Sequence, residues 1–171
     1  MMMQALEAGG LPVYYNRDRN AVNEFHTDGT KRPNPKGLYE PSQQDFQNVE
    51  FPRQHDGKAI KILIPRMGAM AVAAYRVIIM KRDPEQIMDS YERAFGDFWD
   101  TVTRKEWINS YESRFIEAVR QFQNRRDVWD VQVVNMTQLL LTPRWVFTKL
   151  AWPINVPLAA SVVKVKSCPA V

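Results

Sequence analysis

The sequence of 171 residues predicts an α/β fold of three layers, in which helices cover both faces of a parallel sheet. Three short segments are apolar on both faces, as strands of a covered parallel sheet are. Patterns typical of amphipathic helices separate these segments, and the alternation of strand and helix favours parallel pairing. The predicted strands are residues 59–64, 75–80 and 128–134.

The helix that follows residues 75–80 has a complete start signal. Asp83 is a good N-cap, Pro84 suits the first helical position, and Gln86 completes a capping box. The apolar stripe of this helix comprises Ile87, Tyr91, Ala94, Phe95 and Phe98. A longer helix is predicted over residues 103–123, with Ile108, Tyr111, Phe115, Val119 and Phe122 facing inward. Other helices are predicted over residues 1–8 and between Thr142-Pro143 and Pro153.

The length and composition predict one domain, residues 1–171. A short strand is predicted over residues 11–15. Residues 16–56 then contain four prolines and no sustained periodicity, although residues 42–47 favour a short helix. An irregular segment of this length inside a compact domain is typically a lid, a binding loop or a disordered segment. Residues 16–56 are therefore a candidate lid or binding loop.

The net charge of +4 indicates a preference for anionic ligands. Lysine and arginine are scattered along the chain and form no nucleic-acid motif, so no nucleic-acid partner is expected. The longest apolar run, near residues 139–141, is too short to span a bilayer, so no membrane partner is expected. Cys168 is the only cysteine, which excludes a disulfide within the chain and fits a reducing, cytoplasmic location.

Two polar residues suggest a phosphate site after residues 75–80. Arg82 follows the strand, and Ser90 lies two turns into the next helix. Ligands of open α/β sheets bind at the carboxyl ends of strands, where helix N-termini favour anions. An arginine fork and a hydroxyl suit a phosphate monoester. The alternative interpretation is that Arg82 pairs with a carboxylate and Ser90 is solvated.

The segment with these residues, YRVIIMKRDPEQIMDSY, resembles the 3′-phosphate-binding segment of sulfotransferases. In that family an arginine and a serine eight residues later hold the 3′-phosphate of 3′-phosphoadenylyl sulfate (PAPS), and Arg82 and Ser90 match in type and spacing. Further segments resemble a bacterial branch of the family, in the expected order. They are MMMQALEAGGLPV, NPKGLYE, GKAIKILIP and LLLTPRWVFTKLAWPINV, although Leu38 stands at an aromatic position of the second.

The resemblance implies a P-loop NTPase-like fold of the sulfotransferase type. The family opens with a strand and a Pro-Arg-Ser-Gly-Thr type loop that binds the 5′-phosphosulfate with backbone amides. No such pattern, and no lysine-containing phosphate loop, occurs in this sequence. The predicted helix at residues 1–8 also lacks a capping residue before it. We therefore expect a version that is short at its N-terminus, without the first strand and the phosphate loop.

The resemblance also implies catalytic residues. Lys61 resembles the lysine of the Lys-Thr-His-Leu-Pro segment of cytosolic sulfotransferases, and Leu63 stands where that segment has its histidine base. Because some sulfotransferases are thought to use a glutamate, Glu40 is the candidate base. The alternatives are a solvated or helix-capping carboxylate for Glu40 and a strand lysine with a solvated ammonium for Lys61. His26 and His55 are expected to be solvated loop residues, and no metal is expected.

The sequence thus predicts a sulfotransferase-like protein that transfers a sulfuryl group from PAPS to a hydroxyl or an amine. Arg82 and Ser90 are the expected cofactor-binding residues, and Glu40 and Lys61 are the expected catalytic residues. The missing phosphate loop keeps open an alternative, a truncated relative that binds nucleotide or a protein without catalysis. The acceptor and the oligomeric state are left open.

Overall fold

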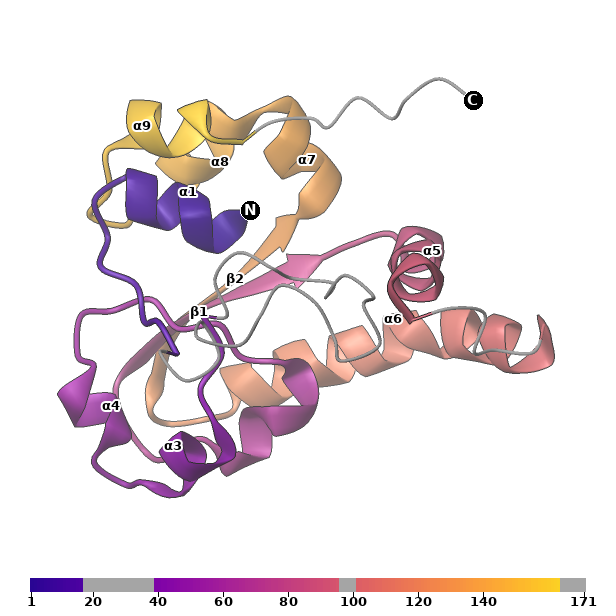
Figure 1. The fold of residues 1–171 in the computed structure, drawn as a ribbon, viewed down its shortest axis with the longest axis horizontal. Coiled ribbons are helices and arrows are strands. Elements are labelled where there is room, and N and C mark those ends of the chain that lie inside the picture. The colour runs from indigo at the N-terminus through magenta and orange to yellow at the C-terminus, as the bar shows by residue number, and fades with distance from the viewer. Residues whose placement is uncertain (17–38, 96–100, 164–171) are drawn as a thin grey trace, which may run out of the picture.

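The computed structural model describes residues 1–16, 39–95 and 101–163 (Figure 1). Its α-helices are α1 (Met2–Ala8), α3 (Gln43–Gln47), α4 (Phe51–Gln54), α5 (Pro84–Phe95), α6 (Thr101–Gln123), α7 (Met136–Leu141), α8 (Pro143–Leu150) and α9 (Val156–Ser161). A 3-10 helix, η1, spans Ile64–Ala69, and the strands are β1 (Tyr75–Lys81) and β2 (Val128–Asn135).

β1 and β2 form a parallel pair, which confirms two of the predicted strands and their orientation. Ile78 lies opposite Gln132, and Lys81 lies opposite Asn135 at the carboxyl end. An irregularity follows Tyr75 at the start of the ladder. The protein is therefore a mixed α/β structure with a two-stranded parallel sheet in its described part.

Helix α6 covers one face of the strand pair. Ile79 of β1 packs with Phe115, Ala118 and Phe122 of α6 in one buried cluster, which half-buried Val77 and Val131 extend. Tyr111 and Val119 of α6 also pack against this cluster. The inward stripe predicted for residues 103–123 is thus confirmed at Tyr111, Phe115, Val119 and Phe122, and Ile108 is partly buried outside the cluster.

Helices α1, α7, α8 and α9 pack on the opposite face (Figure 1). Their fully buried centre includes Leu6, Leu139, Phe147 and Leu150, and these residues share a cluster with Val134 of β2. Ile78 and Met80 of β1 pack against the same cluster. Alternate residues of β1 therefore enter different cores, as the two-residue period of a strand requires.

Figure 1 shows the start of α1 near the carboxyl ends of the strands, and Met2 and Met3 belong to the cluster that also contains Met80 and Val134. At its other end, α1 closely approaches α9. The amide of Asn155 donates to the carbonyl of Gly9 at 2.7 Å. A Cβ on Gly9 would lie 3.1 Å from that of Ala159, so a larger residue would separate the two helices.

The predicted strand at residues 59–64 is wrong beyond its first residue. Ala59 forms an isolated parallel bridge with Val13. Among the described residues, this bridge is also the only strand-like pairing of the predicted strand at residues 11–15. The amide of Lys61 instead donates to the carbonyl of Tyr39, and η1 begins at Ile64 just before Pro65. Among the described residues this segment has no neighbouring strand along its length, so its apolar sequence forms no ladder.

The helix starts mostly follow the capping signals. Asp83 accepts from the amide of Gln86 before α5, and Ser42 and Asp45 form a full capping box at the predicted helix α3. Helix α8 starts at Pro143 as predicted. In the predicted α5 stripe, Ala94 and Phe95 have no described side chains and Phe98 lies outside the described residues. Residues 17–38 of the predicted loop at residues 16–56 also lie outside the described residues.

Asp127 connects the beginnings of the two strands. Its carboxylate accepts from the amide of Ala73 and from the guanidinium of Arg125, at 2.6 Å for the closest pair of atoms. Its carbonyl accepts from the amide of Tyr75. The hydrogen bonds from Arg125 lower the carboxyl pKa to about 2, against the opposing effect of burial, and the Ala73 amide adds to the lowering. Since the ionised carboxylate accepts the bonds from Ala73 and Arg125, its charge supports the start of the sheet.

This geometry predicts an acid dependence. The folded-state pKa lies below the ordinary aspartate value, so the stabilisation is present above about pH 4 and is lost as the pH falls through about 2. Titration of the Asp127 carboxyl by NMR should give a midpoint of about 2 in the parent. Arg125→Gln should raise that midpoint, whereas Arg53→Gln, which changes an exposed arginine, should not. A parent midpoint near 4 would contradict the role of Arg125.

Candidate functional site

The carboxyl end of β1 leads directly into the start of α5. Lys81, the last residue of the strand, is bound to the α6 layer, with its ammonium 2.7 Å from Glu112 and 5.1 Å from the centre of the Phe115 ring. Arg82 follows, and its amide donates to the hydroxyl oxygen of Tyr111 at 3.4 Å. The predicted phosphate-binding arginine thus stands between the end of a strand and the N-terminus of a helix.

One donor of the Arg82 guanidinium, the Nε–H group, is buried. Among the described residues, the Nε atom of Arg82 is buried and makes no hydrogen bond. Buried polar groups of folded proteins are nearly always paired, so such a donor points to a ligand. The alternative that Arg82 pairs with a carboxylate is not seen within the part of the chain that the structure describes.

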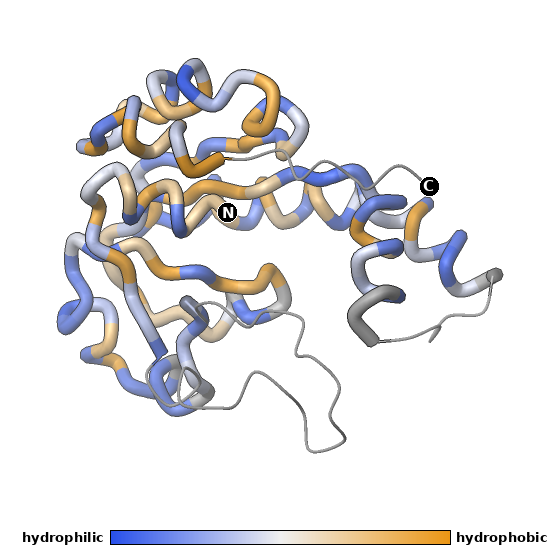
Figure 2. The backbone as a smooth tube through the Cα atoms, turned by 45° about the horizontal axis from the view of Figure 1, so that its top comes forward, coloured by the Kyte–Doolittle hydropathy of each residue, from blue (hydrophilic) through white to orange (hydrophobic). Residues whose placement is uncertain are grey.

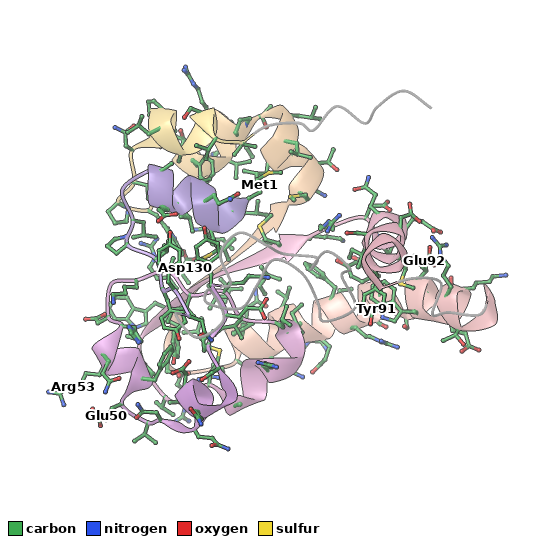
Figure 3. All side chains as sticks on the ribbon, in the orientation of Figure 1. Met1, Glu50, Arg53, Tyr91, Glu92 and Asp130 are labelled. Carbon is green, nitrogen blue, oxygen red and sulfur yellow. The ribbon has the colours of Figure 1, made fainter. Side chains whose placement is uncertain are left out.

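Ser90 is partly buried on α5, one residue after Asp89. The neighbouring acidic face of this helix is tied to α6 by one arginine: Arg104 contacts Glu85, Asp89 and Glu92 at 2.7, 2.7 and 3.0 Å. Figure 3 labels Glu92 and Tyr91 on α5, beside α6. The ion pairs fix α5 against α6, and the one positive charge of Arg104 offsets one of the three negative charges beside Ser90. No contact between Arg82 and Ser90 is among those described.

The structure brings the two predicted catalytic residues together. The Nζ atom of Lys61 lies 2.5 Å from Oε1 of Glu40, although 21 positions separate these residues in the sequence. The side chain of Glu40 is only 12% exposed, and that of Lys61 is 37% exposed. Buried Asn16 donates to the backbone carbonyl of Glu40 at 3.1 Å. The first residue of the predicted loop is thereby joined to a residue well inside it, beside the pair.

The pair lies near the start of α1. Burial, followed by the positive charge of Lys61, lowers the pKa of the Met1 amino group. A base, a cation and a helix N-terminus therefore share one region of the molecule. Figure 3 labels Met1 at this end of α1. This is the same end of α1 that packs beside the carboxyl ends of β1 and β2.

Two tyrosines near this region carry a hydrogen-bond network that sequence reasoning missed. The hydroxyl of Tyr15 donates to the carboxylate of Glu7, which raises the tyrosine pKa. The ring of Tyr15 packs against that of Tyr39, 5.2 Å between centres, and burial raises the pKa of Tyr39. Glu7 occupies a regular helical position, and nothing in its spacing from these tyrosines indicates the contact.

His55 belongs to an aromatic cluster rather than to a solvated loop. Its ring packs against those of Tyr14 and Phe51, at 4.9 and 4.5 Å between centres. Its Nδ1 atom lies 3.3 Å from the ammonium of Lys58. Burial and the charge of Lys58 lower the pKa of His55, so the neutral ring is favoured. His26 lies outside the described residues.

The described residues contain no cluster of three or more histidine, cysteine, aspartate or glutamate side chains arranged to hold a metal ion. No described helix is both long and apolar enough to cross a bilayer. Neither a scan against protein-family models nor searches of curated proteins and of solved structures found a match. The function is therefore inferred from the residues and their geometry.

The Glu40–Lys61 pair makes a prediction for stability. Because Glu40 is mostly buried, its charge should couple with Lys61 by about 0.5–1.5 kcal/mol, more than an exposed pair. A double-mutant cycle of Glu40→Gln and Lys61→Met, followed by urea unfolding, measures this coupling free energy. The control is the cycle of Glu50→Gln and Arg53→Met, an exposed pair 3.8 Å apart, which should give a value near zero. Equal coupling in both cycles would contradict the buried character of the first pair.

Proposed function

We propose that this chain is a sulfotransferase-like domain that binds the 3′-phosphate of PAPS at the carboxyl end of β1. The observation that carries the proposal is the buried Nε–H of Arg82, which has no partner among the described residues. A phosphate oxygen would satisfy this donor with a charge-assisted hydrogen bond. The fold that goes with the proposal is the P-loop NTPase-like fold of the sulfotransferase type.

The surroundings of Arg82 support an anionic ligand. The site lies at the end of a parallel strand and before the N-terminus of α5, where the helix dipole favours negative charge. Ser90 supplies a hydroxyl from the second turn of α5. The carboxylates of α5 that would repel a phosphate are held by Arg104 on α6. Lys81 next to Arg82 already pairs with Glu112, so the binding role falls to Arg82.

In the proposed reaction, the acceptor oxygen or nitrogen attacks the sulfur of PAPS. The bond between that sulfur and the bridging oxygen breaks, and its electron pair stays on the 5′-phosphate of adenosine 3′,5′-bisphosphate. Glu40 takes the proton of the acceptor, and Lys61 stabilises the charge that develops on the bridging oxygen. The contact between Lys61 and Glu40 supports this assignment, because it puts a cation and a base side by side near the start of α1. The segment 16–56 would then cover the acceptor.

A second candidate is a relative that binds a nucleotide or a protein without transferring a sulfuryl group. The observation that favours it is the same ion pair: Lys61 and Glu40 are engaged with each other, and transfer requires this contact to open. The sequence also holds no phosphate-loop pattern that would bind the 5′-phosphosulfate. In this candidate, Arg82 and Ser90 still bind the 3′-phosphate.

The binding site is tested by calorimetric titration with adenosine 3′,5′-bisphosphate. Arg82→Ala and Ser90→Ala should each weaken binding, the arginine change by about 1.5–3 kcal/mol, because a charge-assisted contact is lost. Arg82→Lys should rescue little, since an ammonium lacks the guanidinium fork. Arg53→Ala and Ser113→Ala are matched controls at exposed positions and should bind as the parent does. Parent-like binding by Arg82→Ala and Ser90→Ala would exclude the proposed 3′-phosphate site.

Transfer is tested with radiolabelled PAPS and a panel of hydroxyl and amine acceptors. Glu40→Gln should lower turnover by about 10²-fold or more, since general-base catalysis contributes at least that much. The conservative change Glu50→Gln, at an exposed position, is the control. Unchanged turnover in Glu40→Gln would remove this residue from the mechanism. Bisphosphate binding by a parent that transfers no label would instead establish the second candidate.

A further inference from the structure

All of the net charge of the protein comes from its last 36 residues. Residues 136–171 contain four lysines and arginines and no aspartate or glutamate. The preceding 135 residues contain 19 basic and 19 acidic residues and are therefore neutral. In the described part of this acid-free stretch, the charged residues are Arg144 and Lys149, both exposed on α8. Helices α7, α8 and α9 thus form a layer of single-sign charge.

The same helices expose large apolar side chains. Leu141 at the end of α7 is 72% exposed, Trp145 on α8 is 51% exposed, and Leu158 on α9 is 53% exposed. Figure 2 shows hydrophobic residues recurring along this layer. An open groove runs between the α7–α8 junction and α9, and its lining includes Leu141, Pro143, Trp145, Pro157 and Ala160. Leu141 and Trp145 thus share this groove, and Leu158 follows Pro157 of the lining in the sequence.

The basic side chains border this apolar surface. The ammonium of Lys149 lies over the ring of Trp145, 5.8 Å from its centre, and Arg144 is itself part of the groove lining. Lysine and arginine beside an exposed tryptophan are typical of surfaces that lie at the boundary of water and lipid, where the apolar stems are covered and the charged ends meet head groups.

We propose that the surface formed by Leu141, Arg144, Trp145, Lys149 and Leu158 docks on an anionic phospholipid bilayer. Anionic head groups complement a layer that has basic residues and no acidic ones, and the apolar side chains enter the head-group boundary. A symmetric pairing with a second copy is disfavoured, because it would place like charges of the two copies against each other. The protein lies on the bilayer in this proposal, which revises the expectation of no membrane partner and is independent of the nucleotide site.

The bilayer fits the surface better than an acidic protein does. The groove is open, and Leu141 of its lining is mostly exposed rather than enclosed by a pocket, as is Leu158, the residue after Pro157 of the lining. A protein partner needs closed, complementary packing around its anchoring residues. Lipid head groups and acyl chains adapt to protruding side chains, so they require only the apolar tips and the basic border that the surface has.

The test is co-sedimentation of the full chain with vesicles. The chain should bind vesicles of phosphatidylcholine and phosphatidylserine, should not bind vesicles of phosphatidylcholine alone, and should dissociate at high salt. Lys149→Gln and Arg144→Gln should each lower the partition coefficient about fivefold. Trp145→Ser should lower it about tenfold, through loss of the buried ring.

The matched controls are Trp129→Ser, which removes an exposed tryptophan of β2, and Lys105→Gln on α6. Neither should change vesicle binding. Leu141→Ser provides a second apolar variant at a strongly exposed position, and thermal unfolding verifies that each variant folds. The proposal is overturned if the parent fails to bind the anionic vesicles, or if Trp129→Ser weakens binding as much as Trp145→Ser. Salt-sensitive binding of polyglutamate without binding of vesicles would also overturn it, in favour of an acidic protein partner.

Discussion

The parallel pairing of β1 and β2 is the constraint on which the rest of the structure depends. A parallel pair that carries apolar residues on both of its faces is stable only when both faces are covered. Helix α6 covers one face with Phe115 and Phe122, and α1, α7, α8 and α9 cover the other around Phe147 and Leu150. The helices therefore occupy the places that the strands require, and the ion pair of Asp127 and Arg125 holds the beginning of the ladder.

The same pairing places the candidate phosphate site. The last residue of β1, Lys81, still follows the alternation of the strand and reaches Glu112 and Phe115 on the α6 face. Arg82 comes after the ladder has ended, at the point where the chain leaves the sheet and enters α5. Its buried Nε atom has no partner among the described residues.

Much of this fold follows from local patterns in the sequence. The apolar, β-branched runs of β1 and β2 and the long stripe of α6 are dominated by local periodicity, and they are predicted correctly. The segment at residues 59–64 has an equally apolar pattern but forms a single bridge at Ala59, because a strand needs a neighbour and periodicity supplies none. Helices α7 and α9 were not predicted. Each has six residues, begins at an asparagine cap (Asn135 and Asn155), and is too short for an amphipathic period to be recognised.

The candidate site was predictable to a similar extent. The type and spacing of Arg82 and Ser90 could be found in one continuous segment, whereas the contact of Glu40 with Lys61 depends on how distant segments return to each other. The network of Glu7, Tyr15 and Tyr39 has no sequence signal at all, since it joins a helix face to a loop.

The distribution of paired charges separates the two proposed surfaces from the remainder of the protein. Arg104, Arg125, Lys81 and Lys61 each contact at least one carboxylate, which suits the neutral balance of the first 135 residues. Arg82 and the two basic residues of α8 have no carboxylate contact among the described residues, although the chain carries many carboxylates. A cation that folding leaves unpaired is available to an anion from outside. At the end of β1 the cation is a partly buried guanidinium that suits one compact phosphate, and on α8 the cations border exposed apolar side chains that suit a broad anionic surface.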